Sequence, residues 1–253
     1  PKPSSAASDV YKRQVFHQLT PSTDQIKLYK PKDSYRMGGA GGRKSLTAGT
    51  NLPNGTIIHY FIPNYVKDND QVKLSIHSAD GALIKEFSNK SKENSLKVKN
   101  GGNSFVWNMK YPGAKQLENM VLWGTDFSGA KAVPGNYIVK LKVNDTELTQ
   151  EFTIHKDPTS EGSIDDIKAQ FEFVNEINGV VDKAHKAIEN IRSMKTDLKK
   201  FQSDYADNGF AKDLIEKSKS ILESIDKIEN ELYQTKNQSN QDPLNFGVRL
   251  TNN

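Results

Sequence analysis

The middle of the chain alternates apolar and polar residues, and this alternation predicts half-buried β-strands. Seven short strands are predicted, at residues 56–62, 71–78, 82–88, 94–99, 103–109, 136–143 and 147–154. Turn-forming residues such as Ala79-Asp80-Gly81 and Asn100-Gly101-Gly102 separate them. So many short strands over residues 56–156 are typical of an immunoglobulin-like β-sandwich, with Trp107 and Tyr137 in its core. The irregular stretch 110–133 is expected to be a long connection.

After residue 163 the apolar positions recur at helical spacing, which predicts two helices within residues 163–235. The apolar set of the first helix is Ile164, Ile167, Phe171, Val174, Ile177, Val181, Ala184, Ile188, Ile191, Leu198 and Phe201, and that of the second is Leu214, Ile221, Ile225, Ile228 and Leu232. Ser163 and Asp166 favour a helix start, and Asp207-Asn208-Gly209 favours a chain reversal. We therefore expect an antiparallel helical hairpin after the sandwich. Its stripes, with Ile177, Val181 and Ile188 as structural core, require a third helix, the sandwich or a partner chain.

The flanking segments show no sustained period. Residues 15–55 are rich in Pro, Gly, Ser and Lys and are expected to form a linker, in which only Gln25–Tyr29 is compatible with a strand. Residues 236–253 are predicted to be a tail that stops without a partner element, as a truncated chain would.

The composition limits the class of protein. Of the 253 residues, 35% are hydrophobic and none is cysteine, which excludes disulfides and thiolate chemistry. The longest apolar runs are a handful of residues, whereas a membrane-spanning helix needs about 20. No signal peptide is recognisable at the start of this sequence.

The net charge of +4 is unevenly distributed: residues 1–55 carry +6, residues 56–160 carry +2 and residues 161–253 carry −4. The lysines in the middle alternate with apolar residues, as in Leu96-Lys97-Val98-Lys99, which indicates the solvent face of strands. A nucleic-acid binder would concentrate its positive charge on one face, so no nucleic-acid partner is expected.

The motifs for catalysis and metal binding are incomplete. The five histidines have no metal-ligand spacing, and no Gly-x-Ser-x-Gly nucleophile motif is present. The run Gly42-Arg43-Lys44-Ser45 lacks the glycine that precedes the lysine of a phosphate-binding loop. Asp68-Asn69-Asp70 lacks the other ligands of a calcium loop. No catalytic residue, cofactor site or metal site is therefore predicted.

Aromatic residues offer the remaining candidate site. Tyr111, Trp123 and Phe127 lie in or next to the irregular connection, where their rings are candidates for stacking against sugars. Trp107 and Tyr137 lie in predicted strands and are expected in the core. The aromatic set keeps a carbohydrate-binding module open as an alternative.

Two segments resemble a known domain. The stretch Gly102–Ala114 contains Asn103 and Trp107-Asn108, and Val133–Leu141 contains Pro134-Gly135-Asn136-Tyr137. Together they resemble the immunoglobulin-like domain of the flagellar hook-capping type. Asn108 stands where that family usually has an aspartate.

Three further segments extend the resemblance. Leu28–Arg36, His155–Pro158 and Gln241–Phe246 are similar to the C-terminal region of Bacteroidetes-type sortilin-like, BNR (Asp-box) repeat proteins, often labelled glycosyl hydrolases. The resemblance implies an exported protein in which a β-propeller precedes this region and a further helix follows it. Residues 1–14 resemble a peptide translated from sequencing-adapter read-through, and no part in the fold is expected of them.

The hydrolase label of that family belongs to the propeller. Its Asp-box repeat, Ser-x-Asp-x-Gly-x-x-Trp, has no copy in this sequence. We therefore expect a non-catalytic accessory module that packs against or presents an upstream propeller. The alternative is a carbohydrate-binding module of a glycoside hydrolase, with polysaccharide as its partner.

Overall fold

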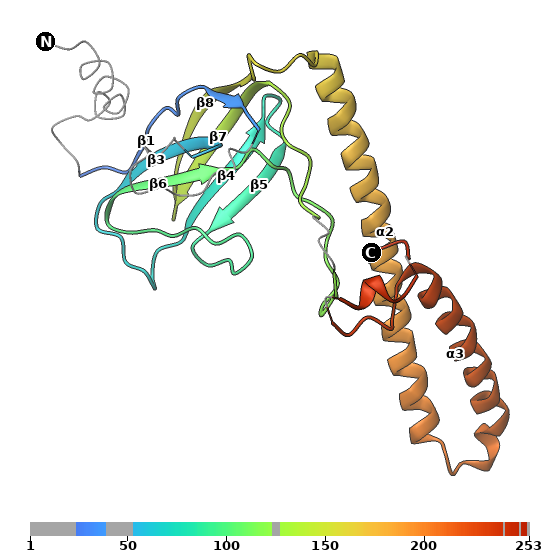
Figure 1. Cartoon of the computed structure of the whole chain (residues 1–253). Helices are drawn as coiled ribbons and strands as arrows, with labels where there is room; N and C mark the ends of the chain where they lie inside the picture. The colour runs from blue at the N-terminus through green and yellow to red at the C-terminus, as the bar shows by residue number, and fades with distance from the viewer. Residues whose placement is uncertain (1–23, 39–52, 123–126, 240, 248, 252–253) are drawn as a thin grey trace, which may run out of the picture. The chain divides into compact units, whose positions relative to one another are not determined.

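The computed structural model describes residues 24–38, 53–122, 127–239, 241–247 and 249–251 (Figure 1). The chain divides into two compact units. The first, here called the β unit, comprises Pro1–Pro112 and Lys131–Phe171, and the second, the helical unit, comprises Gly113–Ala130 and Glu172–Asn253.

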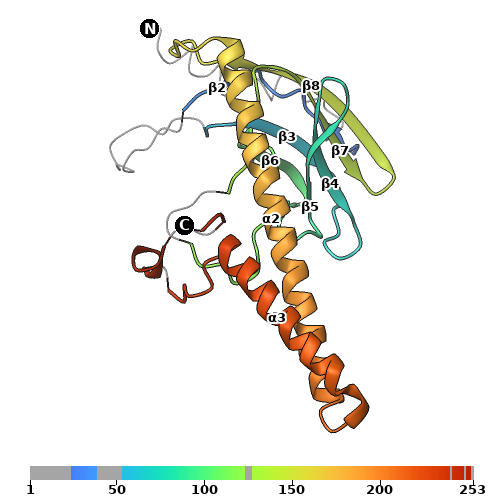
Figure 2. The same cartoon turned by 90° about the vertical axis from the view of Figure 1, so that its right-hand side faces the viewer.

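The strands of the β unit form two sheets (Figures 1 and 2). The strands among the described residues are β1 (Lys27–Leu28), β2 (Ser34–Arg36), β3 (Thr56–Ile62), β4 (Val72–Ser78), β5 (Leu83–Ser88), β6 (Gly101–Trp107), β7 (Gly135–Val143) and β8 (Thr146–Lys156). One sheet has the order β1-β3-β6 and the other the order β2-β8-β7-β4-β5. Neighbouring strands are antiparallel except β2 and β8, which are parallel.

The two sheets share one hydrophobic core because each strand turns alternate residues inward. On β3, for example, Ile58, Tyr60 and Ile62 are buried. Trp107 is fully buried and packs edge-on against Tyr137, with ring centroids 5.8 Å apart. Both residues lie where the sequence places them.

The structure corrects two parts of the predicted β region. Residues 94–99 form no strand, although Leu96 is buried and Val98 packs on the core, so the alternation there reflects an anchored loop. The expected linker contributes two strands: β1, which lies within the strand-compatible run Gln25–Tyr29, pairs with β3, and β2, which was not expected, pairs with β8. Each is too short to show a period of its own.

The helical hairpin is present as predicted. Helix α2 spans Ile164–Asp204, the 3-10 turn η2 spans Gly209–Ala211 and helix α3 spans Lys212–Leu232. Ser163 and Asp166 form a reciprocal cap: the Asp166 amide donates to Ser163 Oγ (3.0 Å) and the Ser163 amide to Asp166 Oδ2 (2.8 Å).

A further 3-10 turn, η3, spans Asp242–Leu244 in the tail. The tail folds back on the end of α3, where Gln234 donates to the Gly247 carbonyl (2.7 Å) and Thr251 Oγ1 to the Leu232 carbonyl (3.1 Å). Among the described residues, no helix combines the length and apolar character that crossing a membrane requires.

Candidate functional site

Helix α2 carries an unbroken stripe of apolar residues whose spacing alternates between four and three. The stripe consists of Phe173, Ile177, Val180, Ala184, Ala187, Ile191, Met194, Leu198, Phe201 and Tyr205. This alternation is the heptad pattern by which helices pack along a common seam. The apolar set predicted from the sequence mixes this stripe with the neighbouring one, although the heptad signal was present.

Helix α3 carries a matching stripe with the same alternation. It consists of Leu214, Ser218, Ile221, Ile225, Ile228 and Leu232, in which Ser218 is the one polar residue. We call the two stripes together the apolar face. Its N-terminal part is Phe173, Ile177 and Val180, and its C-terminal part is α2 from Ala187 to Tyr205 together with the α3 stripe.

Much of the apolar face is exposed. Phe173, Ile177 and Val180 are 62%, 45% and 48% exposed, and the value for Met194, Tyr205, Leu214, Ile221 and Ile228 lies between 44% and 55%. Single exposed apolar residues are ordinary on protein surfaces, but a contiguous series marks an interaction surface. The apolar face is therefore the strongest candidate functional site among the described residues.

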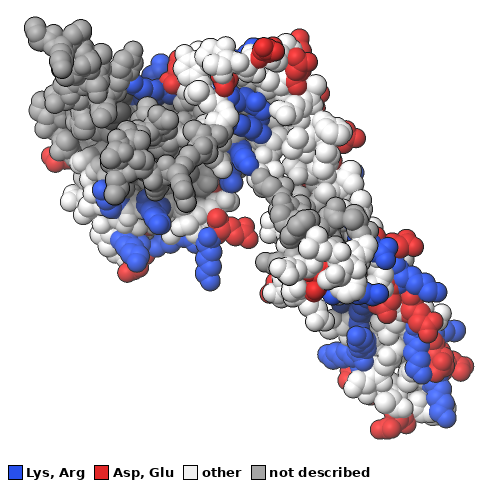
Figure 3. Space-filling view, viewed as in Figure 1, with Lys and Arg blue, Asp and Glu red and all other residues white. Residues whose placement is uncertain are grey.

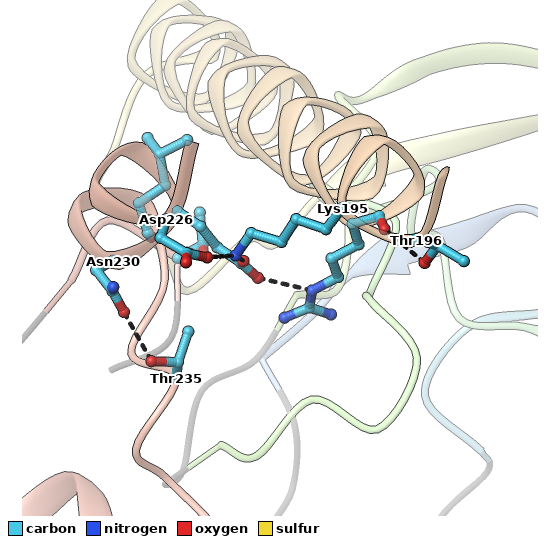
Figure 4. A network of polar contacts seen from close by, with 9 residues as sticks. Lys195, Thr196, Asp226, Asn230 and Thr235 are labelled. Carbon is cyan, nitrogen blue, oxygen red and sulfur yellow. Dashed lines mark hydrogen bonds and ion pairs between the residues drawn. The ribbon is translucent and has the colours of Figure 1, made fainter. Parts of the chain in front are cut away.

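A polar network fixes how the two helices pair (Figure 4). Arg192 Nε donates to Glu229 Oε1 (2.8 Å), and Lys195 forms ion pairs with both Asp226 and Glu229. Further along, Gln202 Nε2 donates to Ser218 Oγ (2.8 Å). Later residues of α2 thus meet earlier residues of α3, which defines an antiparallel register.

Burial and ion pairing shift the pKa values of Glu229 and Lys195 in opposite directions. Burial alone would raise the pKa of Glu229, but hydrogen bonds from Lys195 and Arg192 outweigh it and hold that pKa below its ordinary value. Burial likewise disfavours the charged form of Lys195, whereas Asp226 and Glu229 raise its pKa overall. Glu229 and Lys195 are therefore both ionised at neutral pH.

The network and the apolar face occupy adjacent positions on each helix. Lys195 and Gln202 follow Met194 and Phe201 by one residue, and Glu229 follows Ile228 by one residue. Since successive helical residues are about 100° apart, the apolar stripes of both helices flank the polar contact on the same side of the hairpin.

The segment 113–130, expected to be only a connection, packs on another side of α2. The Lys115 amide donates to Asp182 Oδ1 (2.6 Å), and Lys115 Nζ pairs with Glu189 Oε1 (2.8 Å). The Lys115 carbonyl accepts a hydrogen bond from Nδ1 of buried His185. None of these three α2 residues belongs to the apolar face.

A small hydrophobic cluster holds the segment 113–130 against the two helices. Leu117 packs with Ile188 and Tyr233, all buried, so the segment, α2 and the end of α3 meet at one point. The Arg192 guanidinium lies 4.9 Å from the centre of the Tyr233 ring. Sequence periodicity carried no signal for this docking, because Leu117 and Met120, which both join the cluster, belong to no sustained apolar period.

The predicted hairpin core is only partly buried. Ile188 is fully buried and Val181 is half-buried, but Ile177 is exposed. The expectation that Ile177 is a core residue is wrong because α3, with 21 residues against 41 in α2, ends level with Ala187. Ile177 lies more than two helical turns beyond that end.

The predicted aromatic platform is not assembled among the described residues. Tyr111 belongs to the β unit, where its ring packs edge-on against Phe171 with centroids 4.8 Å apart. Phe127 belongs to the helical unit, where its ring packs against His185 with centroids 5.8 Å apart. Trp123 lies outside the described residues.

In the part of the chain that the structure describes, no group of three or more His, Asp and Glu side chains is placed to hold a metal ion. Comparison with protein-family models and with curated proteins finds no match for this chain.

Proposed function

We propose that this chain is a non-catalytic accessory module that holds together the domains of an exported protein. The observation that carries the proposal is the exposed N-terminal part of the apolar face, Phe173, Ile177 and Val180. Three large apolar side chains in helical succession gain free energy when a neighbouring domain covers them. The neighbour we propose is the upstream β-propeller that the resemblance to BNR repeat proteins implies.

The β unit is proposed to be an immunoglobulin-like sandwich that serves as the scaffold. Two contacts support this topology. Trp107 is buried between the sheets, and the Tyr137 hydroxyl donates to the Val133 carbonyl four residues upstream (2.6 Å). A buried tryptophan and a tyrosine that is hydrogen-bonded to the preceding corner are features of immunoglobulin-like domains.

A carbohydrate-binding role has weaker support. Sugar-stacking aromatics need an open ring face, whereas Tyr111 and Phe127 are each packed against another ring of the chain. Accordingly, the hydrolase label of the resembling proteins is proposed to belong to the propeller.

The test is a thermal melt of a longer protein in which an Asp-box propeller precedes this chain. The variant Phe173→Asp with Ile177→Asp should melt several degrees lower than the parent, because docking would bury two charges. In the isolated chain the same variant should melt close to the parent, since both positions are exposed there.

Leu83→Asp is the matched control, because Leu83 is exposed on the β unit. It should leave the melting temperature of the longer protein unchanged. An unaltered melting temperature in the Phe173 and Ile177 variant would overturn the docking proposal. Cleavage of glycosides by the purified chain would overturn the non-catalytic assignment.

A further inference from the structure

We propose that the C-terminal part of the apolar face binds a second copy of this chain, so that two hairpins form a symmetric four-helix bundle. This inference goes beyond the docking of a neighbouring domain and uses different residues. It rests on the register of the stripes and on the charges that border them.

The intrachain contacts set the level of every residue along the hairpin. Lys195 lies opposite Asp226, and Gln202 lies opposite Ser218. On this register the stripe residues stand level in the pairs Ala187 and Leu232, Ile191 and Ile228, Met194 and Ile225, Leu198 and Ile221, Phe201 and Ser218, and Tyr205 and Leu214. Rotation about a two-fold axis parallel to the helices does not change the height of a residue along the bundle. The residue pairs that stand level within one copy therefore also stand level between α2 of one copy and α3 of the other.

Two rows of residues, here called borders, flank each stripe. The first border consists of the residues that directly follow stripe residues in the sequence, and it contains Lys195 and Glu229, which pair with each other within the chain. In a four-helix bundle this border faces the intrachain neighbour and the other border faces the next helix. The second border is therefore where a second copy would be recognised.

The second border consists of residues that directly precede stripe residues, and it is exposed. It contains Asn190, Asp197 and Asp204 on α2 and Lys217, Ser224 and Glu231 on α3, and the α2 side chains are complementary in charge or hydrogen bonding to those on α3. At the levels given above, Asp204 meets Lys217 of the second copy, Asp197 meets Ser224 and Asn190 meets Glu231. Each pair is an ion pair or a donor with an acceptor, and no like charges meet.

The alternative pairing of α2 with α2 is less favourable. Two antiparallel α2 stripes centred on Leu198 would bring Asp197 of one copy against Asp197 of the other. Like charges at an interface are repulsive, so this border favours the pairing of α2 with α3. Figure 3 shows that acidic and basic side chains both lie along the hairpin.

The first experiment is sedimentation equilibrium of the chain over a range of concentrations. The expected result is a dimer of the 28.3 kDa chain. A monomer at all concentrations, or an assembly other than a dimer, would overturn the proposal. The docking test above uses Phe173 and Ile177, so the two proposals fail independently.

Variants of the apolar face test the site of contact. Ile221→Asp with Ile228→Asp should be monomeric, and far-UV circular dichroism should remain that of the parent because both residues are exposed in a single copy. Leu83→Asp, on the exposed surface of the β unit, is the control and should remain dimeric. A dimer that survives the paired Ile221 and Ile228 substitution contradicts the proposed interface.

Charge exchange tests the register. Asp204→Lys should weaken the dimer about tenfold, since it sets two lysines against each other at both symmetric contacts. The double variant Asp204→Lys with Lys217→Asp should restore the parent affinity. Failure of this rescue would overturn the pairing of α2 with α3.

Discussion

Glu229 on α3 and Lys195 on α2 form an ion pair inside the hairpin, and only 6% and 18% of their side-chain surfaces are exposed. Arg192 binds the same carboxylate from one helical turn earlier. An apolar heptad seam by itself tolerates shifts of a whole heptad, whereas a buried charge pair is satisfied in one register only. The pair therefore specifies how α3 lies against α2.

Replacing Glu229 by alanine should lower the free energy of unfolding of the hairpin by about 2 kcal/mol, because Arg192 loses its carboxylate partner and Lys195 keeps only Asp226. Urea unfolding followed at the helical circular dichroism band measures this loss. The matched control is Glu223→Ala on the exposed surface of α3, which should change stability little. A loss for Glu229→Ala no larger than that of the control would contradict the role of the pair.

The same carboxylate should make stability depend on acid pH. Its pKa is lower in the folded state than the ordinary value of 4.5, so the unfolded state takes up the proton first as the pH falls. The stabilisation is complete above 4.5 and is lost as the pH falls through the folded-state pKa. The difference in unfolding free energy between the parent and Glu229→Gln should therefore shrink from pH 7 to pH 3. A constant difference would count against the linkage.

Asn103 should be essential to the turn that leads into β6. Its side chain accepts from the Lys99 amide (2.9 Å) and donates to the carbonyls of Lys99 (2.8 Å) and Gly101 (2.9 Å). Asn103→Ala leaves these groups unpaired in a buried site and should cost about 2 kcal/mol in urea unfolding of the chain. Asn69→Ala, at an exposed turn position, is the control and should be nearly neutral. Equal effects of the two substitutions would refute this role.

His185 should hold the segment 113–130 on α2. Its Nδ1 donates to the Lys115 carbonyl, and the ring is 2% exposed. His185→Ala should speed amide hydrogen exchange around Lys115 and Leu117 while leaving the helical signal of α2 unchanged. Lys186→Ala changes the neighbouring exposed position and serves as the control. Unchanged exchange in the His185 variant would show that other contacts suffice.

The amino-acid sequence predicts most of the strands and both long helices, because their periods are local. The predicted strand 56–62 matches β3, and the chain reverses at Asp207-Asn208-Gly209 between α2 and α3, as the sequence indicates. The same local pattern was misleading at 94–99, where Leu96 and Val98 pack on the core but backbone pairing is limited to one bridge between Ser95 and Ser88. Periodicity reports which residues are buried and does not report which backbone groups pair.

Contacts between distant segments could not be predicted from the sequence for a related reason. The pairing of β2 with β8 joins residues more than a hundred positions apart, and Lys115 reaches Asp182 and Glu189 across 67 and 74 positions. Segments this short carry too few residues to show a period, so only the assembled chain reveals their partners.

At the candidate site, the heptad spacing of the apolar stripes is visible in the sequence, but which stripe residues stay exposed depends on the folded chain. Ile177 and Ile188 belong to similar patterns on one helix, yet the first is exposed and the second is fully buried. The difference follows from the reach of the packing partners: Leu117 and Tyr233 cover Ile188, whereas α3 ends before it reaches Ile177. Burial depends on which chain segment lies against a residue, and that is a property of the fold as a whole.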